Sequence, residues 1–294
     1  MTQTTKRFLL AAVILVCTSA VGLAQDIKLD VPYVPTKYPI VDEMLRMAAV
    51  SKNDIVYDLG CGDGRLVITA AQKFGCRGVG YDIDPERIKE CLENAKSAGV
   101  MEKVKFVLGD LFQADFHEAT VIPMYLLPSV NLKLRPKILR ELRPGSRVVS
   151  HDFSMGDWQP DDHTTLEVDG MSHDVYGWVV PANVSGAWSW SLNLGSSAVQ
   201  FGMDVTQKFQ VPDAKISIAG AAMEVKEMKL AGDRIQFTVE SRIGGKAAML
   251  SFEGKTANHQ ITGSIKGTIE GQAVSYPWKA VRKPGSETNI DDEQ

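Results

Sequence analysis

The sequence predicts two domains of different class, a doubly wound α/β domain followed by an all-β antiparallel barrel or sandwich. From about residue 54 to residue 152, short β-branched apolar runs alternate with segments of helical periodicity. After Pro181, apolar residues alternate with polar ones, and turns rich in Gly, Asn and Asp recur. Unbroken apolar runs are typical of strands buried on both faces of a parallel sheet, whereas alternation is typical of half-buried antiparallel strands. We therefore place the α/β domain at residues 25–182 and the β-rich domain at residues 183–283.

Strands and helices are expected to follow one another in the α/β domain. Five strands are expected, at Ile55–Leu59, Gly78–Asp82, Val104–Leu108, Thr120–Tyr125 and Arg147–His151. Helices are expected at Arg65–Phe74, Pro85–Ser97 and about Pro136–Leu142. This alternation predicts right-handed βαβ units and a parallel sheet. Around Asp169 and Gly170, residues 164–168 and 172–180 predict a hairpin that closes the sheet with an antiparallel edge.

The β-rich domain contains about eight strand-like segments between Trp188 and Arg282, which predict a small barrel or sandwich. Trp188 and Trp190 are two residues apart and so face the same side of a strand, where packing in the domain core is expected. The alternative is a barrel that holds a small apolar ligand, although no residue specifies one. The polar residues 284–294 are expected to be disordered.

Charge and cysteine content exclude some classes of partner. Lys and Arg number 32 against 36 Asp and Glu, so the net charge of -4 gives no electrostatic basis for binding nucleic acid. Beyond residue 24 the cysteines are Cys61, Cys76 and Cys91, an odd number without CxxC spacing. We therefore expect neither a disulfide framework nor a metal site.

The N-terminus predicts export. Lys6 and Arg7 precede an apolar run that leads through small residues to Ala24. This pattern is typical of a secretory signal peptide over residues 1–24. The alternative is an uncleaved membrane anchor, because the uncharged stretch from Phe8 to Gln25 approaches the ~20 residues that cross a bilayer. Either interpretation places the remainder outside the cytoplasm, in the periplasm or the medium, and the second adds membrane association.

The stretch VYDLGCGDGRL, from Val56 to Leu66, lies at the first strand-to-helix junction, where open α/β sheets bind ligands. Its spacing is Gly60-x-Gly62-x-Gly64, which is neither a dinucleotide fingerprint nor a P-loop. Asp58 and Asp63 would repel a phosphate at close range, whereas a ligand with an ammonium and a sulfonium would find partners. S-adenosylmethionine is such a ligand, and glycines let its amino-acid portion lie against the backbone.

Two further acids end the next strands. Asp82 is placed to accept both ribose hydroxyls, and Asp110 is placed for the adenine amino group. The alternative is that these acids only cap turns. A glycine loop followed by an acid after the second strand and an acid after the third predicts S-adenosylmethionine as the cofactor.

These motifs resemble the class I, seven-stranded S-adenosylmethionine-dependent methyltransferases, which have a Rossmann-like fold, over roughly Tyr33 to Pro181. The resemblance implies that the methionine end is held by Asp58, Gly60, Gly62 and Gly64. It implies that Asp82 holds the ribose and Asp110 the adenine, with Ile83 and Leu111 flanking the ring. The chain departs from amino-methylating relatives after the fourth strand, where residues 125–128 read Tyr-Leu-Leu-Pro and not Asn-Pro-Pro-Tyr.

A narrower resemblance is carried by Pro-Tyr-Val-Pro-Thr at residues 32–36, GDGRLVITAA, RELRPGSRVVSHDF and the pair Asp157-Trp158. These segments resemble the small methyltransferases related to the mitochondrial enzyme that methylates a lysine of the ATP synthase c-subunit. The resemblance implies that Tyr33 and Thr36 form a lid over the methionine moiety. The alternative is that they belong to an extended Pro-rich segment.

Methyl transfer to an amine or hydroxyl requires an in-line approach and loss of a proton. The candidate bases or orienting groups are Tyr125, His151 and Asp152, after the fourth and fifth strands. His151 has the alternative of a structural role. Three other histidines, His117, His163 and His173, are expected in loops or turns without a shared site. Trp158 and Trp178 are expected in the core, with an aromatic wall as the alternative.

The sequence therefore predicts an exported S-adenosylmethionine-dependent methyltransferase. The acceptor is expected to be a protein lysine first and a small molecule next. The alternative is a non-catalytic envelope binding protein that retains the cofactor fold and uses the β domain to hold a ligand or partner. Export supports this alternative, because S-adenosylmethionine is a cytosolic metabolite.

Overall fold

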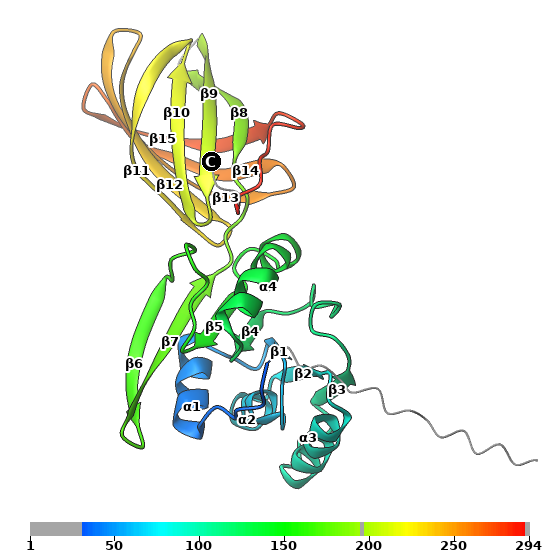
Figure 1. The fold of residues 1–294 in the computed structure, drawn as a ribbon. Coiled ribbons are helices and arrows are strands. Elements are labelled where there is room, and N and C mark those ends of the chain that lie inside the picture. The colour runs from blue at the N-terminus through cyan, green and yellow to red at the C-terminus, as the bar shows by residue number, and fades with distance from the viewer. Residues whose placement is uncertain (1–30, 195–196, 292–294) are drawn as a thin grey trace, which may run out of the picture.

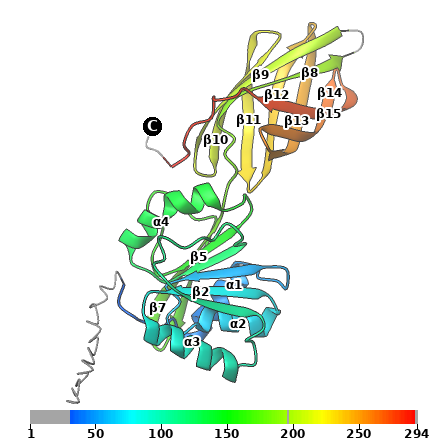
Figure 2. The same cartoon turned by 90° about the vertical axis from the view of Figure 1, so that its right-hand side faces the viewer.

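The computed structural model describes residues 31–194 and 197–291 of the 294-residue chain. The predicted signal peptide or anchor at residues 1–24 lies outside the described residues. Two bodies lie end to end, a sheet flanked by helices and a barrel joined to it near α4 and β5 (Figure 1). A view turned by 90° shows the same separation (Figure 2).

The first body contains a seven-stranded sheet in the order β3-β2-β1-β4-β5-β7-β6. Its parallel strands are β1 (Ile55–Leu59), β2 (Arg77–Asp82), β3 (Val104–Leu108), β4 (Val121–Met124) and β5 (Arg147–His151). The antiparallel edge consists of β7 (Met171–Val179) and β6 (Asp162–Val168). The predicted doubly wound fold and its edge hairpin are therefore confirmed.

Helices cover both faces of this sheet because alternate strand residues point to opposite sides. Val56 and Val149 pack on the face covered by α1 (Tyr38–Met47) and α2 (Arg65–Phe74). Their chain neighbours Tyr57 and Val148 pack on the other face, with α4 (Pro128–Glu141). Helix α3 (Pro85–Ser97) begins at the expected cap, where the Asp84 side chain accepts a hydrogen bond from the Glu86 amide.

Two helices differ from expectation. Helix α1 was not predicted from the sequence. Its buried residues nevertheless have helical spacing, at Ile40, Val41, Met44 and Leu45. Helix α4 begins at Pro128, eight residues before the predicted start, and contains Pro136. A proline removes one backbone hydrogen bond within a helix. Pro136 and Leu132, one turn earlier, are both exposed, so water can satisfy the carbonyl that loses its donor.

The second body is a closed barrel of eight antiparallel strands in which each strand pairs with the next and β15 returns to β8. The strands are β8 (Gly186–Leu194), β9 (Ser197–Lys208), β10 (Val211–Ile218), β11 (Ala221–Ala231), β12 (Arg234–Ile243), β13 (Lys246–Ala257), β14 (Gln260–Ile269) and β15 (Gln272–Arg282). Aromatic rings meet inside, with Phe252 centred 4.6 Å from Phe237 and 5.3 Å from Trp278. Trp188 and Trp190 are buried in the same core, as expected.

Residues 284–291 correct the expectation of a disordered tail, because Ser286 and Thr288 form hydrogen bonds with residues at the start of the barrel. Residues 292–294 of the predicted tail lie outside the described residues. Ile290 is only 4% exposed, and its carbonyl accepts a hydrogen bond from the Phe209 amide at 2.9 Å. The Asp291 carboxylate lies 2.7 Å from Arg135 Nε on α4. One buried isoleucine and a salt bridge thus hold a segment whose polar composition indicated disorder.

The two bodies meet at α4 and at the loop between β5 and β6. The Phe209 ring lies 5.9 Å from the Trp158 ring and stacks on it, and the Arg135 guanidinium lies 5.0 Å from the same Phe209 ring. Lys208 also pairs with Asp157 at 2.8 Å. None of the helices in the described part of the chain combines the length and apolar character needed to cross a bilayer.

Candidate active site

The glycine loop between β1 and α2 has a backbone that only glycine adopts easily. Gly60, Gly62 and Gly64 have φ angles of 84°, 56° and 79°. A Cβ at Gly62 would lie 2.5 Å from the Tyr33 ring, and a Cβ at Gly64 would lie 2.8 Å from the Phe106 ring. The amides of Gly60 and of the next residue both donate to the Tyr81 carbonyl, 2.8 Å away in each case. The loop is therefore fixed to β2 and tightly enclosed.

Asp82, at the end of β2, is bound to this loop. Its Oδ2 accepts a hydrogen bond from the Gly62 amide at 2.8 Å, and its Oδ1 accepts one from the Asp84 amide at 3.0 Å. Burial raises the pKa of this carboxyl group. Each carboxylate oxygen has two lone pairs, so Asp82 can cap the turn and still accept hydrogen bonds from a ligand.

Asp58, at the end of β1, is a buried acid that lacks a cation. It is 2% exposed, and burial, together with the charges of Asp82 and Asp63, raises its pKa to about 8. Among the described residues, it forms no ion pair and no side-chain hydrogen bond. A cationic ligand group in the adjoining cleft would satisfy this carboxylate.

Asp63, which was expected to repel a phosphate, is paired with a neighbouring arginine. Its carboxylate pairs with Arg65 at 2.6 Å, and Arg65 Nη1 also donates to the Thr36 carbonyl at 2.7 Å. Because Arg65 pairs with it, Asp63 repels a phosphate less than the sequence suggested. Asp58 is the acid that favours a cationic ligand here.

A cleft of about 910 Å³, including open solvent at its mouth, lies along the carboxyl ends of β1, β2 and β3. All the predicted cofactor-binding residues except Gly64 line it. They are Tyr33, Thr36, Asp58, Gly60, Gly62, Asp82, Ile83, Asp110 and Leu111. Gly64 is not among the residues that line the cleft, and it is the N-cap of α2. Asp110 also accepts a hydrogen bond from the Phe112 amide at 2.8 Å, so it too combines a turn cap with a place on the cleft.

The N-terminal segment at residues 31–36 forms one wall of the cleft. The Tyr33 ring lies against Gly62, and the Arg87 guanidinium lies 4.5 Å from the same ring. Tyr33 is 42% exposed, whereas Thr36 is buried. The segment is extended, and it also covers the glycine loop, so the two interpretations made from the sequence are compatible.

The predicted catalytic residues lie at different depths. Tyr125 lines the cleft, whereas His151 and Asp152 lie behind its wall. The His151 ring is centred 3.9 Å from the Tyr125 ring, and its Nδ1 lies 3.3 Å from Thr36 Oγ1. Burial lowers the pKa of His151 to about 4, against the opposing effect of the Asp152 carboxylate. The imidazole is therefore neutral at pH 7.

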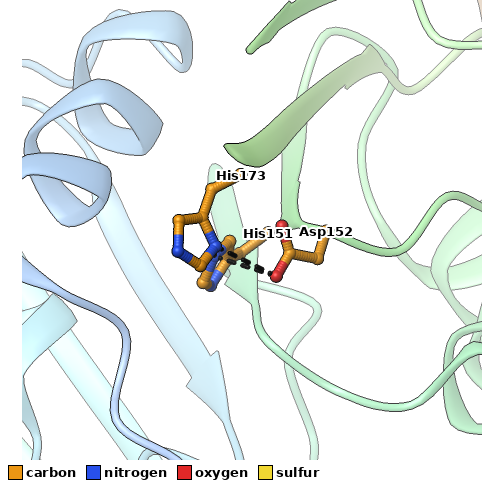
Figure 3. A group of neighbouring side chains, drawn as sticks. All are labelled: His151, Asp152 and His173. Atoms are coloured by element: carbon orange, nitrogen blue, oxygen red, sulfur yellow. Dashed lines mark hydrogen bonds and ion pairs between the residues drawn. The ribbon is translucent and has the colours of Figure 1, made fainter. Parts of the chain in front are cut away.

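His173 is a residue that sequence reasoning misplaced. It lies on β7 and not in a loop, with Nδ1 3.0 Å from His151 Nε2 and 3.2 Å from Asp152 Oδ2 (Figure 3). The strand register pairs His151 with Val175, so His173 is a diagonal neighbour on the same face. The predicted hairpin contained His173, but the register of β7 against β5 was needed to place it beside His151.

The other sequence candidates are not part of this cluster. His163 lies on β6 and its Nε2 is 3.0 Å from the Asp174 carboxylate. His117 pairs with Asp115 at 2.6 Å on the surface. Trp158 and Trp178 are buried and 5.8 Å apart, so they are core residues, as expected, and not a wall of the cleft.

A doubly wound sheet with a glycine loop after β1, and acids after β1, β2 and β3 around one cleft, defines the class I S-adenosylmethionine-dependent methyltransferases. The family description "ANTKMT methyltransferase domain" matches residues 58–162. A protein-lysine N-methyltransferase of Saccharolobus islandicus is 49% identical over 151 residues, which are 51% of this chain and 94% of that protein. The chain therefore belongs to the family of protein-lysine N-methyltransferases.

Other relatives also match about half of this chain. The human (Homo sapiens) lysine N-methyltransferase of the ATP synthase c-subunit is 33% identical over 140 residues, 48% of this chain and 59% of that protein. Among solved structures, an RNA methyltransferase from Salinibacter ruber in complex with S-adenosyl-L-homocysteine is 54% identical with a TM-score of 0.48. That match covers 51% of this chain and 96% of the other.

Proposed function

We propose that the chain transfers a methyl group from S-adenosylmethionine to the ε-amino group of a lysine in another protein, outside the cytoplasm. The observation that carries the lysine assignment is the 49% identity to a protein-lysine N-methyltransferase across 94% of that protein. The cleft supports the cofactor part of the proposal, because Asp58, Asp82 and Asp110 all line it.

The cofactor assignment rests on residues around the cleft. Asp58 would hold the ammonium group and Asp82 the ribose hydroxyls, while Asp110 would bind the adenine. Ile83 and Leu111, which line the same part of the cleft, would flank the ring. Bound there, S-adenosylmethionine supplies a methyl group on a sulfonium.

Tyr125 is the candidate for orienting the acceptor, because it is the predicted catalytic residue that reaches the cleft. Burial and the nearby Asp152 carboxylate raise the pKa of its phenol. The hydroxyl therefore stays protonated at neutral pH, and its oxygen can accept a hydrogen bond from an amine. Holding the amine in line with the methyl group is the main demand of this reaction.

The decisive experiment uses the purified chain, methyl-labelled S-adenosylmethionine and an extract containing membrane and soluble proteins. Labelled protein with methylated lysine, identified by mass spectrometry, is expected. Asp82→Ala should abolish labelling, whereas Glu240→Gln, on the outer face of the barrel, should not. Label in RNA or in a small molecule would overturn the lysine assignment. Cofactor binding without any labelled product would favour the non-catalytic alternative.

Export rests on the basic and apolar N-terminal pattern alone. The mass of the chain from the native cell's envelope fraction tests it. A chain that begins at Gln25 supports cleavage, and a full-length chain in the membrane fraction supports an anchor. A full-length chain in the cytoplasm would refute export.

A further inference from the structure

Three side chains at the end of β5 and on β7 converge on one point. His151 Nε2, His173 Nδ1 and Asp152 Oδ2 form a triangle with sides of 3.0, 3.2 and 3.3 Å (Figure 3). Four-coordinate zinc, with bonds of about 2.0–2.1 Å and tetrahedral angles, holds neighbouring ligand atoms about 3.3 Å apart. The triangle is therefore close to one face of a zinc tetrahedron.

The outer atoms of two of these side chains are also held. His151 Nδ1 lies 3.3 Å from Thr36 Oγ1, and Asp152 Oδ1 accepts a hydrogen bond from the Asp174 amide at 3.0 Å. A histidine ligand commonly donates its other ring N–H to an outer partner, which fixes the tautomer, and ligating carboxylates are hydrogen-bonded in the same way. An imidazole that donates from Nδ1 to Thr36 presents its Nε2 lone pair to the cluster.

The backbone of Asp152 is left-handed and is hydrogen-bonded to β7. Its φ is 61°, in the left-handed region that few residues other than glycine adopt. The Asp152 amide donates to the Asp174 carbonyl at 2.7 Å, which holds this conformation at the end of β5. The hydrogen bond to Asp174 thus fixes the backbone from which the Asp152 carboxylate reaches the cluster.

No lysine or arginine among the described residues pairs with the half-buried Asp152 carboxylate. Within the described part of the chain, the ion-pair partners found for Asp152 are His151 and His173. The side chains of Asp152 and His173 are 26% and 12% exposed, so one side of the cluster is open to water.

We propose that His151, Asp152 and His173 bind one divalent transition-metal ion, zinc before the others, with water completing its coordination. Two imidazole nitrogens and one carboxylate oxygen suit zinc, whereas magnesium prefers oxygen ligands and octahedral geometry. The ion fastens β5 to β7 behind the wall formed by Thr36 and Tyr125. This site is independent of the methyl acceptor, because it needs neither cofactor nor substrate.

Calorimetry with zinc chloride alone tests the proposal, on the full chain without an affinity tag and after treatment with a chelator. One ion per chain is expected to bind, and magnesium chloride should give no comparable signal. His173→Gln and Asp152→Asn should each weaken zinc binding at least about tenfold. His163→Gln and His117→Gln are matched controls outside the cluster and should bind zinc like the unaltered chain.

Thermal unfolding separates loss of the site from loss of the fold. In chelator, the ligand variants should unfold at the temperature of the unaltered chain, and zinc should raise only the latter. If one ligand variant fails to fold, the other carries the test. Absence of zinc binding by the unaltered chain, or equal binding by His173→Gln, overturns the proposal. Cobalt supplies a second readout, because a four-coordinate site gives intense visible absorption that the ligand variants should lose.

Discussion

Replacing Asp58 by Asn should change how cofactor binding depends on pH. The pKa of Asp58 is raised to about 8, so at pH 7 about 0.9 of the free protein carries a proton there. An ammonium group bound beside this carboxylate favours its charged form. Binding at pH 7 should therefore release about 0.9 of a proton from Asp58.

The affinity follows from the same linkage. Between pH 8 and pH 6, protonation of Asp58 should weaken cofactor binding about 50-fold, because the competent carboxylate falls from one half of the molecules to about 1%. Asn cannot lose a proton, so Asp58→Asn should bind weakly at both pH values and should lack this dependence.

Titration calorimetry in two buffers of different ionisation enthalpy measures the number of protons released. The difference between the unaltered chain and Asp58→Asn cancels protons exchanged by the cofactor itself. Equal proton release from the two proteins at pH 7 would show that Asp58 is not the group that meets the ammonium.

Three further predictions concern stability and the glycine loop. Without cofactor, the free energy of unfolding should fall as pH rises from about 4 to about 8, because the folded-state pKa of Asp58 is raised. Asp58→Asn should lack this loss, and thermal denaturation at pH 8 should show it to be more stable than the unaltered chain. Gly62→Ala should lose cofactor binding by calorimetry, because its Cβ would lie 2.5 Å from the Tyr33 ring. The control Gly99→Ala, also at positive φ but in open space, should lose only about 1 kcal/mol of stability. Equal cofactor binding by the two variants would contradict the tight enclosure of the glycine loop. Trp278→Ala should destabilise the barrel by about 3–5 kcal/mol in chemical denaturation, and a smaller loss would mean that its aromatic core can collapse around the gap.

The cofactor side of the cleft could be predicted from sequence because its signals are local. Asp58, Asp82 and Asp110 each end or follow a strand within a few residues of a glycine, and parallel strands bring their carboxyl ends to one edge. Order along the chain was enough to place them together. The aromatic core of the barrel was predictable for the same reason, since alternation within one strand determines which residues face inward.

The parts that were missed depend either on contacts between distant segments or on the direction of a side chain. His173 meets His151 only through the register of β5 with β7, and nothing within either strand reveals it. Asp63 and Arg65 are two positions apart, but the sequence does not show that their side chains turn toward each other and pair. Ile290 is one apolar residue in a polar segment, and its burial depends on Phe209, which lies 81 positions earlier.

The barrel contacts the α/β body at α4, and α4 follows Tyr125, which lines one half of the cleft. The half of the cleft proposed to bind the cofactor lies at the ends of β1, β2 and β3. The half proposed to meet the acceptor includes Tyr125, just before α4, and the Phe209 ring of the barrel packs on Arg135 of α4. The same phenylalanine stacks on Trp158, in the loop that follows β5. The barrel therefore packs on a helix whose first residue follows Tyr125 by three positions, so a change at the junction can reach Tyr125 through one short segment of the chain.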